Sequence, residues 1–190
     1  MTNATIDVRA VSLAELAQLT PIPSGFRTDK VFRLSKRFSG RGLLWDLEEE
    51  VLGTPLHRQY DHGRPDEWLS SYADSPQEEL RFLVAEAGEN FLGSLTWRNL
   101  AWNDTLLLVD IRVRENSRRG GVGSALLGRL LEEVRTLRVR GIMVETQIDN
   151  YAAICFYRRQ GFEIAGFNDH LYSNDDLDRQ SVALYLFRPA

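Results

Sequence analysis

The chain has very few of the residues that characterise secreted, metal-binding or membrane proteins. A single cysteine, Cys155, excludes an internal disulfide. The histidines His57, His62 and His170 show no metal-ligand spacing, so we expect no bound metal. The segment from Met1 to Arg9 lacks the apolar core of a signal peptide, and no run approaches the roughly 18 apolar residues of a membrane span. These absences predict a cytoplasmic protein without a membrane partner.

Neither sign of charge is in strong excess. The 23 Lys and Arg residues stand against 27 Asp and Glu residues, which leaves a formal net charge of −4. This balance gives no bulk attraction to nucleic acid, so we expect no nucleic-acid partner. The length of 190 residues, with 43% hydrophobic and 26% charged residues, is enough for one globular domain with a proper core. We therefore expect a single domain over residues 1–190.

The hydrophobic pattern predicts alternating strands and helices. Ser12 favours the start of a short helix that reaches Leu19, and the segments 80–87 and 91–97 are typical of a hairpin. An apolar stripe predicts a long helix over 121–138. We also expect a short helix at 45–52, a turn-rich stretch at 57–75 and a solvated loop at 175–178. The remaining expected elements are a helix at 152–160 and strands at 6–10, 26–38, 106–114, 142–147, 162–165 and 181–187.

Glycine is concentrated in one informative place, the run Arg-Arg-Gly-Gly-Val-Gly from Arg118 to Gly123. It follows an apolar strand and precedes the long helix. Without a Cβ, backbone N–H groups approach a ligand closely, and the helix N-terminus adds a partial positive charge. The pattern therefore predicts a phosphate site. The spacing excludes a dinucleotide fingerprint, whose third glycine would be Leu126, and a Walker A loop, because no Gly-Lys pair occurs.

A second segment, from Asn150 to Phe162, strengthens this interpretation. Asn150 is a good helix N-cap, and Gly161 is a good helix end. Asn150, Ala153 and Tyr157 fall on one face of the expected helix. Together the two segments read R-x-x-G-x-G and N-x-x-A-x-x-F-Y-x-x-x-G-F. In this the chain resembles the GNAT superfamily of N-acetyltransferases, which bind acetyl-CoA.

The resemblance implies a fold and a cofactor. The fold is of the mixed α/β class, with a mostly antiparallel twisted sheet of about six or seven strands flanked by about four helices. A splay is expected between the fourth and fifth strands. Residues 1–79 would form the acceptor side, and residues 80–190 would form the acetyl-CoA-binding core. The cofactor-binding residues that the resemblance implies are Ile111, Arg112, Val113, Arg118, Arg119, Gly120, Gly121, Val122, Gly123, Ser124, Asn150 and Tyr157.

The same resemblance assigns catalytic roles. Tyr157 is the general acid toward the leaving thiolate, with a structural tyrosine as the alternative. The backbone N–H of Ile111 is expected to polarise the thioester carbonyl. Asp110 is our first choice for the base that deprotonates the amine, and Glu145 is the second. An ion pair between Asp110 and Arg112 is the competing structural explanation, and both stay open at this point.

A closer resemblance is to streptothricin acetyltransferases. It rests on Glu145-Thr146-Gln147, on the Asn150 segment and on Leu171-Tyr172-Ser173-Asn174. It implies a small cationic amine as the acceptor and a role in antibiotic resistance. The substrate-binding residues expected on this basis are Trp45, Trp102, Asp110, Glu145 and Tyr172. The alternatives are an acetyltransferase for protein N-termini or lysines and a non-catalytic acyl-CoA-binding module; a homodimer is left open.

Overall fold

The computed structural model describes residues 5–60, 69, 72 and 80–190. Two compact units make up the chain: Met1–Ser24, Gln59–Met143 and Pro189–Ala190 form the first, and Gly25–Arg58 and Val144–Arg188 form the second. The elements are β1 (Asp7–Val11), α1 (Leu13–Leu16), β2 (Gly25–Ser39), β3 (Gly42–Gln59), β4 (Leu80–Ala87), β5 (Asn90–Leu100), β6 (Thr105–Val113), the 3₁₀ turn η4 (Glu115–Ser117), α2 (Val122–Val134), β7 (Gly141–Gln147), α3 (Tyr151–Arg159), β8 (Glu163–Asn168), α4 (Asp176–Arg179) and β9 (Ala183–Pro189).

The described strands form a seven-stranded sheet and a separate two-stranded ribbon. The sheet has the order β1-β4-β5-β6-β7-β9-β8, and the ribbon pairs β2 with β3. The pairs β1–β4, β4–β5, β5–β6 and β8–β9 are antiparallel. With the helices α1 to α4, this arrangement confirms the predicted mixed α/β class and its mostly antiparallel sheet. The splay between two strands stays a prediction.

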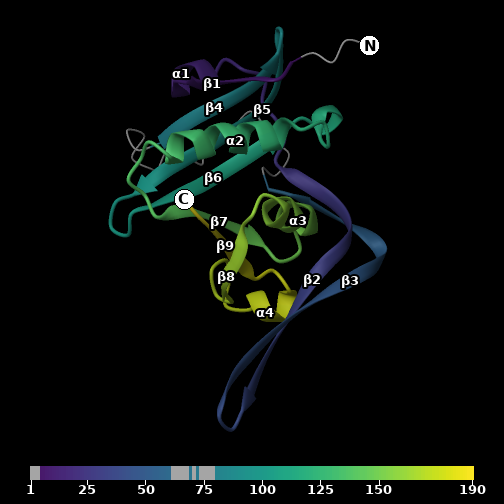
Figure 1. Ribbon diagram of the computed structural model, residues 1–190. Helices are drawn as coiled ribbons and strands as arrows, with labels where there is room; N and C mark the ends of the chain where they lie inside the picture. Colours follow the sequence, from purple (N-terminus) through teal and green to yellow (C-terminus); the bar gives the residue numbers. More distant parts are fainter. Residues whose placement is uncertain (1–4, 61–68, 70–71, 73–79) are drawn as a thin grey trace. The chain divides into compact units, whose positions relative to one another are not determined.

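In the first unit, α2 packs on the face of β4, β5 and β6 (Figure 1). Leu126, Leu127 and Leu130 are fully buried there, as their helical spacing predicts. Each such leucine stabilises the fold by about 1.5–3 kcal/mol. The helix ends at Val134, earlier than expected, so Leu137 lies outside it and is 39% exposed. The predicted hairpin is confirmed as β4 and β5, joined through a tight turn.

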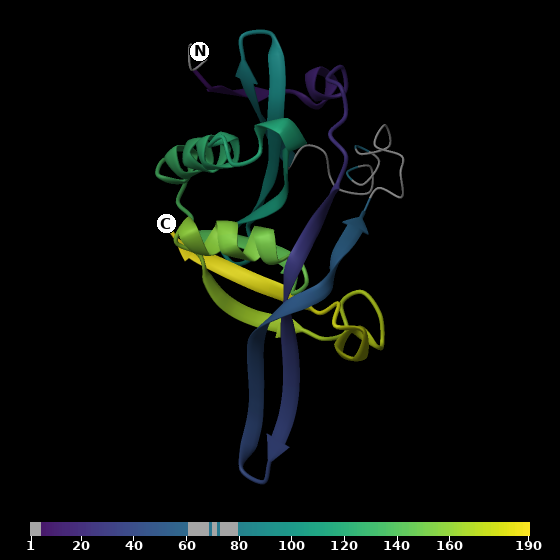
Figure 2. The ribbon, with the colours of Figure 1, turned by 90° about the vertical axis from the view of Figure 1, so that its right-hand side faces the viewer.

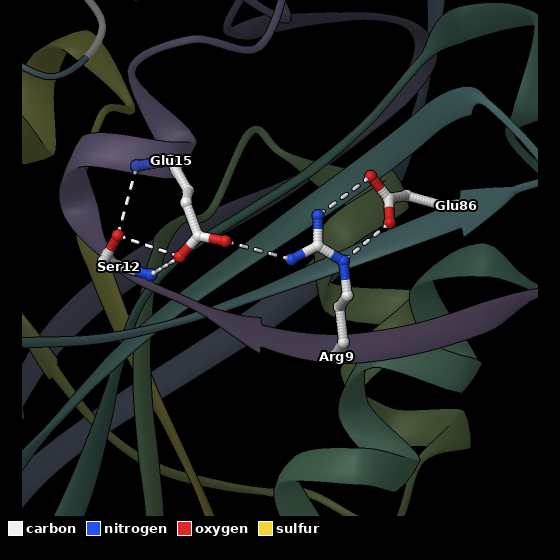
Figure 3. Close-up of polar contacts among 4 residues, drawn as sticks. All are labelled: Arg9, Ser12, Glu15 and Glu86. Atoms are coloured by element: carbon white, nitrogen blue, oxygen red, sulfur yellow. Dashed lines mark hydrogen bonds and ion pairs between the residues drawn. The ribbon is translucent and has the colours of Figure 1, made fainter.

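The start of α1 is fixed by a capping box (Figure 3). The Glu15 N–H donates to Ser12 Oγ at 3.2 Å, and the Ser12 N–H donates to Glu15 Oε2 at 2.8 Å. Each residue thus satisfies a helix-terminal donor of the other. Arg9 links this cap to β4, because its guanidinium reaches Glu86 at 2.8 Å and Glu15 at 3.4 Å. The N-terminal strand and helix are therefore held as one piece.

The second unit contains the long ribbon of β2 and β3, which extends past α3 and beyond β8 (Figure 2). Near α3 the ribbon is packed: the Phe32 ring stacks on Tyr151 with centroids 5.2 Å apart, and the Phe32 N–H donates to the Ile148 carbonyl at 3.2 Å. At its far end the side chains are exposed, with Phe38 at 81% and Leu44 at 53%. The ribbon therefore has a buried root and a solvated tip.

Two expectations about local structure are wrong, for physical reasons. The segment 45–52 is part of β3 rather than a helix, because its acidic residues pair across to basic residues of β2. The pairs are Lys30–Glu49 at 2.6 Å, Arg33–Glu50, and Arg37–Asp46 at 3.3 Å. The segment 175–178 is largely helical, as α4, and Asp176 within it is buried rather than solvated.

Other boundaries differ by a few residues. The last strand runs over Ala183–Pro189 instead of 181–187. The stretch expected to be turn-rich begins inside β3, and most of the remainder of 57–75 lies outside the described residues. Within the part of the chain that the structure describes, no helix is long and apolar enough to cross a bilayer.

Candidate functional site

The predicted phosphate turn lies between η4 and α2 in the first unit. Arg118 is extended, Arg119 has a φ of 64° and Gly121, the N-cap, has a φ of 89°. A Cβ on Gly120 would lie 3.1 Å from the Ser117 carbonyl oxygen, so this position is also tight. Arg119 and Gly121 thus have left-handed backbone conformations, and between them the Gly120 N–H donates to the Ser117 carbonyl at 3.3 Å.

The N-terminus of α2 is suited to an anion. Val122, Gly123 and Ser124 form its first turn. No side chain caps this helix, and its first turn holds no acidic residue. Because the first N–H groups of a helix lack intrahelical acceptors, they are oriented outward together with the positive end of the dipole. These features fit the diphosphate of a coenzyme A thioester.

Arg118 has a defined place in this turn. Its Nε donates to the Val113 carbonyl at 3.2 Å, which ties the turn back to the end of β6. Ile111, Arg112 and Val113, the strand residues predicted to contact the cofactor, are half-buried on β6. The first unit thus brings the predicted strand residues and the predicted turn together through one side-chain hydrogen bond.

Asp110, the sequence-based first choice for the base, lies on β6 within a closed network. Its Oδ2 accepts from Arg112 Nε at 2.5 Å and from the Tyr72 hydroxyl at 3.1 Å. Arg112 Nη1 also donates to the Ile22 carbonyl at 2.9 Å, and Thr96 Oγ1 donates to the Tyr72 oxygen at 3.2 Å. We call these side chains the Asp110 group. The predicted ion pair between Asp110 and Arg112 is present.

Tyr72 is a member of this group that sequence reasoning missed. Burial raises the pKa of the Tyr72 phenol well above its usual value, and the nearby Asp110 carboxylate raises it further. The phenol therefore stays neutral and acts as a donor. No local pattern marks Tyr72, because its partners lie 24 and 38 positions away in the chain. Asp110 is consequently held by one cation and one neutral donor.

Glu145, the second choice, lies on β7 in the second unit in a different environment. Its Oε1 accepts a hydrogen bond from the Tyr172 hydroxyl. Burial raises the pKa of Glu145 above its usual range, and the hydrogen bond from Tyr172 lowers it only in part. The structure thus brings together two predicted site residues, Glu145 and Tyr172, which we call the Glu145 group.

Trp45 and Trp102 differ in their surroundings. Trp45 stacks on Phe167 of β8, with ring centroids 5.6 Å apart, and Lys36 Nζ lies 4.8 Å above the Trp45 ring. Lys36 also forms a 2.8 Å ion pair with Asp169. Trp102 lies in the turn between β5 and β6 and is 83% exposed. Trp102 precedes the N-terminal end of β6, whereas Asp110 lies near the C-terminal end of the same strand.

The α3 helix carries the remaining predicted residues. Asn150 is its N-cap, as predicted, because its side-chain oxygen accepts from the Ala153 N–H at 3.3 Å. Gly161, with a φ of 84°, follows the helix end. Tyr157 is 4% exposed and contacts the rings of Phe156 and Phe162, with centroids 5.3 and 5.5 Å away. Its phenol is thus placed by rigid aromatic packing.

A pocket of about 280 Å³ also lies in the second unit, between the ribbon and the residues that flank α3 and α4. Arg58 Nε donates to Asp149 at its wall, at 2.9 Å. None of the predicted site residues lines this pocket. Among the described residues, no three His, Cys, Asp or Glu side chains gather as they would around a metal ion.

Comparison with known proteins settles the family. Residues 44–162 match the profile of the acetyltransferase (GNAT) family. The chain belongs to this family. Membership makes the protein an acetyltransferase whose acetyl donor is acetyl-CoA, which confirms the predicted enzyme class and cofactor. The matched residues include the glycine-rich turn before α2 and the Asn150 segment.

Individual relatives extend this similarity. Streptothricin acetyltransferase A of Bacillus subtilis (strain 168) is 32% identical over 131 residues, which cover 69% of this chain and 72% of the relative. A crystal structure of nourseothricin acetyltransferase has a TM-score of 0.77 and 28% identity, covering 97% of this chain and 98% of its own. A Bacillus anthracis str. Ames structure in complex with acetyl coenzyme A has a TM-score of 0.73 and 24% identity, covering 98% and 100%. This acetyltransferase thus shares its fold with these two solved structures over nearly its whole length.

Proposed function

We propose that this acetyltransferase moves the acetyl group from acetyl-CoA to a primary amine of a small cationic acceptor of the streptothricin type. The observation that carries the proposal is the Glu145 group, a half-buried carboxylate whose hydrogen-bond donor is a neutral phenol rather than a cation. The streptothricin acetyltransferase relative supports the choice of acceptor class. In this role the protein would confer antibiotic resistance.

The thioester supplies an activated acyl group, and the chain has to hold it. The turn from Arg118 to Ser124 binds the diphosphate through backbone N–H groups and the end of α2. On β6, the backbone of Ile111 and Val113 binds the pantetheine amides, and the Ile111 N–H donates to the thioester carbonyl. Tyr157 gives its proton to the departing thiolate, since a phenol pKa of about 10 lies near a thiol pKa of about 8.5.

The acceptor amine needs a base. An alkylammonium with a pKa of about 10.4 is neutral in only about one molecule in two thousand at pH 7. A carboxylate with a raised pKa accepts a proton more effectively than one paired with a cation. We therefore assign this role to Glu145 and give Asp110 second place, which reverses the order expected from sequence. Asp110 takes second place because its carboxylate is already paired with Arg112, whose Nε lies 2.5 Å from it.

The aromatic side chains divide the work of acceptor binding. Trp45 already stacks on Phe167 and carries Lys36 over its ring, so we assign it to holding the ribbon against β8. Tyr172 and Trp102 are 43% and 83% exposed, and each offers a face to a cationic or planar group. These two are the residues that we propose contact the acceptor.

The proposal is tested by mixing the purified protein with acetyl-CoA and streptothricin and following thiol release. A panel of peptides with free N-termini or lysines is assayed in parallel. We expect thiol release with streptothricin and only background release with peptides. Turnover on peptides alone would show a protein acetyltransferase instead. If calorimetry detected acetyl-CoA binding but no amine were acetylated, the protein would be a non-catalytic acyl-CoA-binding module.

A further inference from the structure

The chain between β8 and β9, residues 169–182, is anchored to β2 at two points. Lys36 Nζ forms an ion pair with Asp169 at 2.8 Å. The Gln180 side chain bonds the backbone of Leu34 in both directions: its Oε1 accepts from the Leu34 N–H at 2.9 Å, and its Nε2 donates to the Leu34 carbonyl at 3.1 Å. We call residues 169–182 the β8–β9 segment. Its two ends are thus fixed against one strand.

Inside this segment, a buried carboxylate orders the backbone around Tyr172. Asp176 is 1% exposed. Its Oδ2 accepts from the Tyr172 N–H at 2.8 Å, and its Oδ1 accepts from Ser173 Oγ at 2.6 Å. Burial opposes ionisation of Asp176, but these hydrogen bonds outweigh it, so the pKa of Asp176 lies below its usual value. A charged, fully engaged carboxylate therefore fixes the position from which the Tyr172 side chain projects.

The Tyr172 side chain extends from this fixed point to Glu145. It is 43% exposed, and its hydroxyl donates to Glu145 Oε1. A carboxylate has two oxygens that accept hydrogen bonds. Oε1 of Glu145 is engaged in this way, which restricts the carboxylate and leaves Oε2 as the second acceptor oxygen. The charged groups of the same segment have partners of their own: Asp169 has Lys36, and Asp175 has Arg179 at 2.7 Å.

On these contacts, and resting on the proposed function, we infer that Tyr172 is a positioning residue that holds the Glu145 carboxylate for the acceptor amine, and that Asp176 holds Tyr172 in place. The role differs from acceptor contact alone. A contact residue changes the affinity for the acceptor, whereas a positioning residue changes the rate and the protonation of Glu145. Orientation of a reacting group is worth large factors in rate, so a loosened carboxylate is costly.

The test compares Tyr172→Phe with a matched control, Tyr185→Phe on β9, which removes a phenol that has no part in the proposed chemistry. The carboxyl carbon of Glu145, assigned through Glu145→Gln, is titrated by ¹³C NMR in each protein. Because the Tyr172 hydrogen bond lowers the pKa of Glu145, its loss moves the titration upward. Tyr185→Phe leaves the titration unchanged.

Kinetics supply the second readout. For Tyr172→Phe we expect kcat with streptothricin to fall about 10- to 100-fold, and we expect the pH at which activity rises to move upward together with the Glu145 titration. KM should change by less than about threefold, because phenylalanine keeps the aromatic face that we propose contacts the acceptor. Asp176→Asn should shift the titration and kcat in the same direction and by less, because Asn keeps one of the two acceptor oxygens; circular dichroism verifies that this variant is folded.

The outcomes separate this inference from the proposed function. If Tyr172→Phe left the Glu145 titration unmoved, or raised KM alone, Tyr172 would only contact the acceptor without positioning Glu145, and the inference would be wrong while the function stood. If the wild-type protein acetylated no amine, the proposed function would fail, and the titration would still decide whether Tyr172 holds the carboxylate.

Discussion

The Asp110 group and the Glu145 group place a carboxylate on a strand of the same sheet, and they treat it in opposite ways. Asp110 is bound by the guanidinium of Arg112, which is itself tied to a backbone carbonyl. Glu145 has a neutral phenol as its donor, and burial raises its pKa. The first arrangement pairs its carboxylate with a cation, whereas the second gives its carboxylate a neutral donor and a raised pKa.

This difference shows how environment assigns roles to two similar residues. Both carboxylates interrupt apolar strands, and from sequence both qualify as bases. An adjacent cation favours the ionised form and weakens the carboxylate as a proton acceptor. A desolvated carboxylate with a neutral donor is a stronger acceptor near neutral pH. The comparison therefore favours Asp110 as a structural residue and Glu145 as a catalytic one.

The largest effect is expected from replacing Glu145, the carboxylate that we propose is the catalytic base. Glu145→Gln should lower kcat with streptothricin by about 10²- to 10⁴-fold, because the amine loses its general base. Asp110→Asn serves as the matched amide substitution and should lower kcat by less than about tenfold. Steady-state thiol release over a pH series measures both. A larger loss for Asp110→Asn, recovered at high pH, would return the role of base to Asp110.

An intermediate effect tests the structural side. Arg112→Met keeps most of the side-chain volume but leaves the Asp110 carboxylate without its cation. We expect the free energy of unfolding to fall by about 1–3 kcal/mol, the usual cost of a partly buried charge without its partner. Urea denaturation of this variant and of Arg129→Met, at an exposed pair on α2, gives the comparison. Equal losses in the two variants would show that the Asp110 group contributes little to stability.

The smallest effect concerns the pH dependence of stability. The pKa of Glu145 is raised in the folded state, so the folded protein holds this proton to a higher pH than the unfolded chain does. Stability from this group is therefore present at low pH and declines as pH rises from about 4 through the folded pKa. Glu145→Gln should gain in Tm over wild type as the pH rises above about 4, by less than about 3 °C. Glu89→Gln in the exposed β4–β5 turn should show no such trend.

Features whose physics is local were predicted from the sequence. The Asn150 cap, the Gly161 helix end, the β4–β5 hairpin and the buried stripe of α2 depend on residues within a few positions of one another. In the turn before α2, Gly121 has a left-handed φ that glycine adopts without steric cost, whereas Arg119 has a left-handed φ although it is not a glycine. Short-range preferences decide such elements, and tertiary packing then agrees with them.

Features whose partners lie far along the chain were missed or assigned wrongly. A helix was expected around Glu49 and Glu50. The ion pairs that place them in a strand are made with Lys30 and Arg33, 19 and 17 positions away, and no local pattern reveals them. The acidic run around Asp176 suggested solvent exposure because nothing in it reveals the hydrogen bonds that bury it. Our proposal that Glu145 rather than Asp110 is the base rests on the contact between Glu145 and Tyr172, which lie 27 positions apart in the chain.

The ribbon of β2 and β3 is held by apolar packing at one end and by ion pairs at the other. Toward α3, ring stacking and buried aliphatic side chains such as Val31 and Leu34 hold it, and dissolved ions barely affect these contacts. Farther out, the ion pair Arg37–Asp46 joins largely exposed side chains, and salt screens the attraction between them. Raising the salt concentration should therefore weaken the contacts at the outer end of the ribbon and leave the packing at its inner end unchanged.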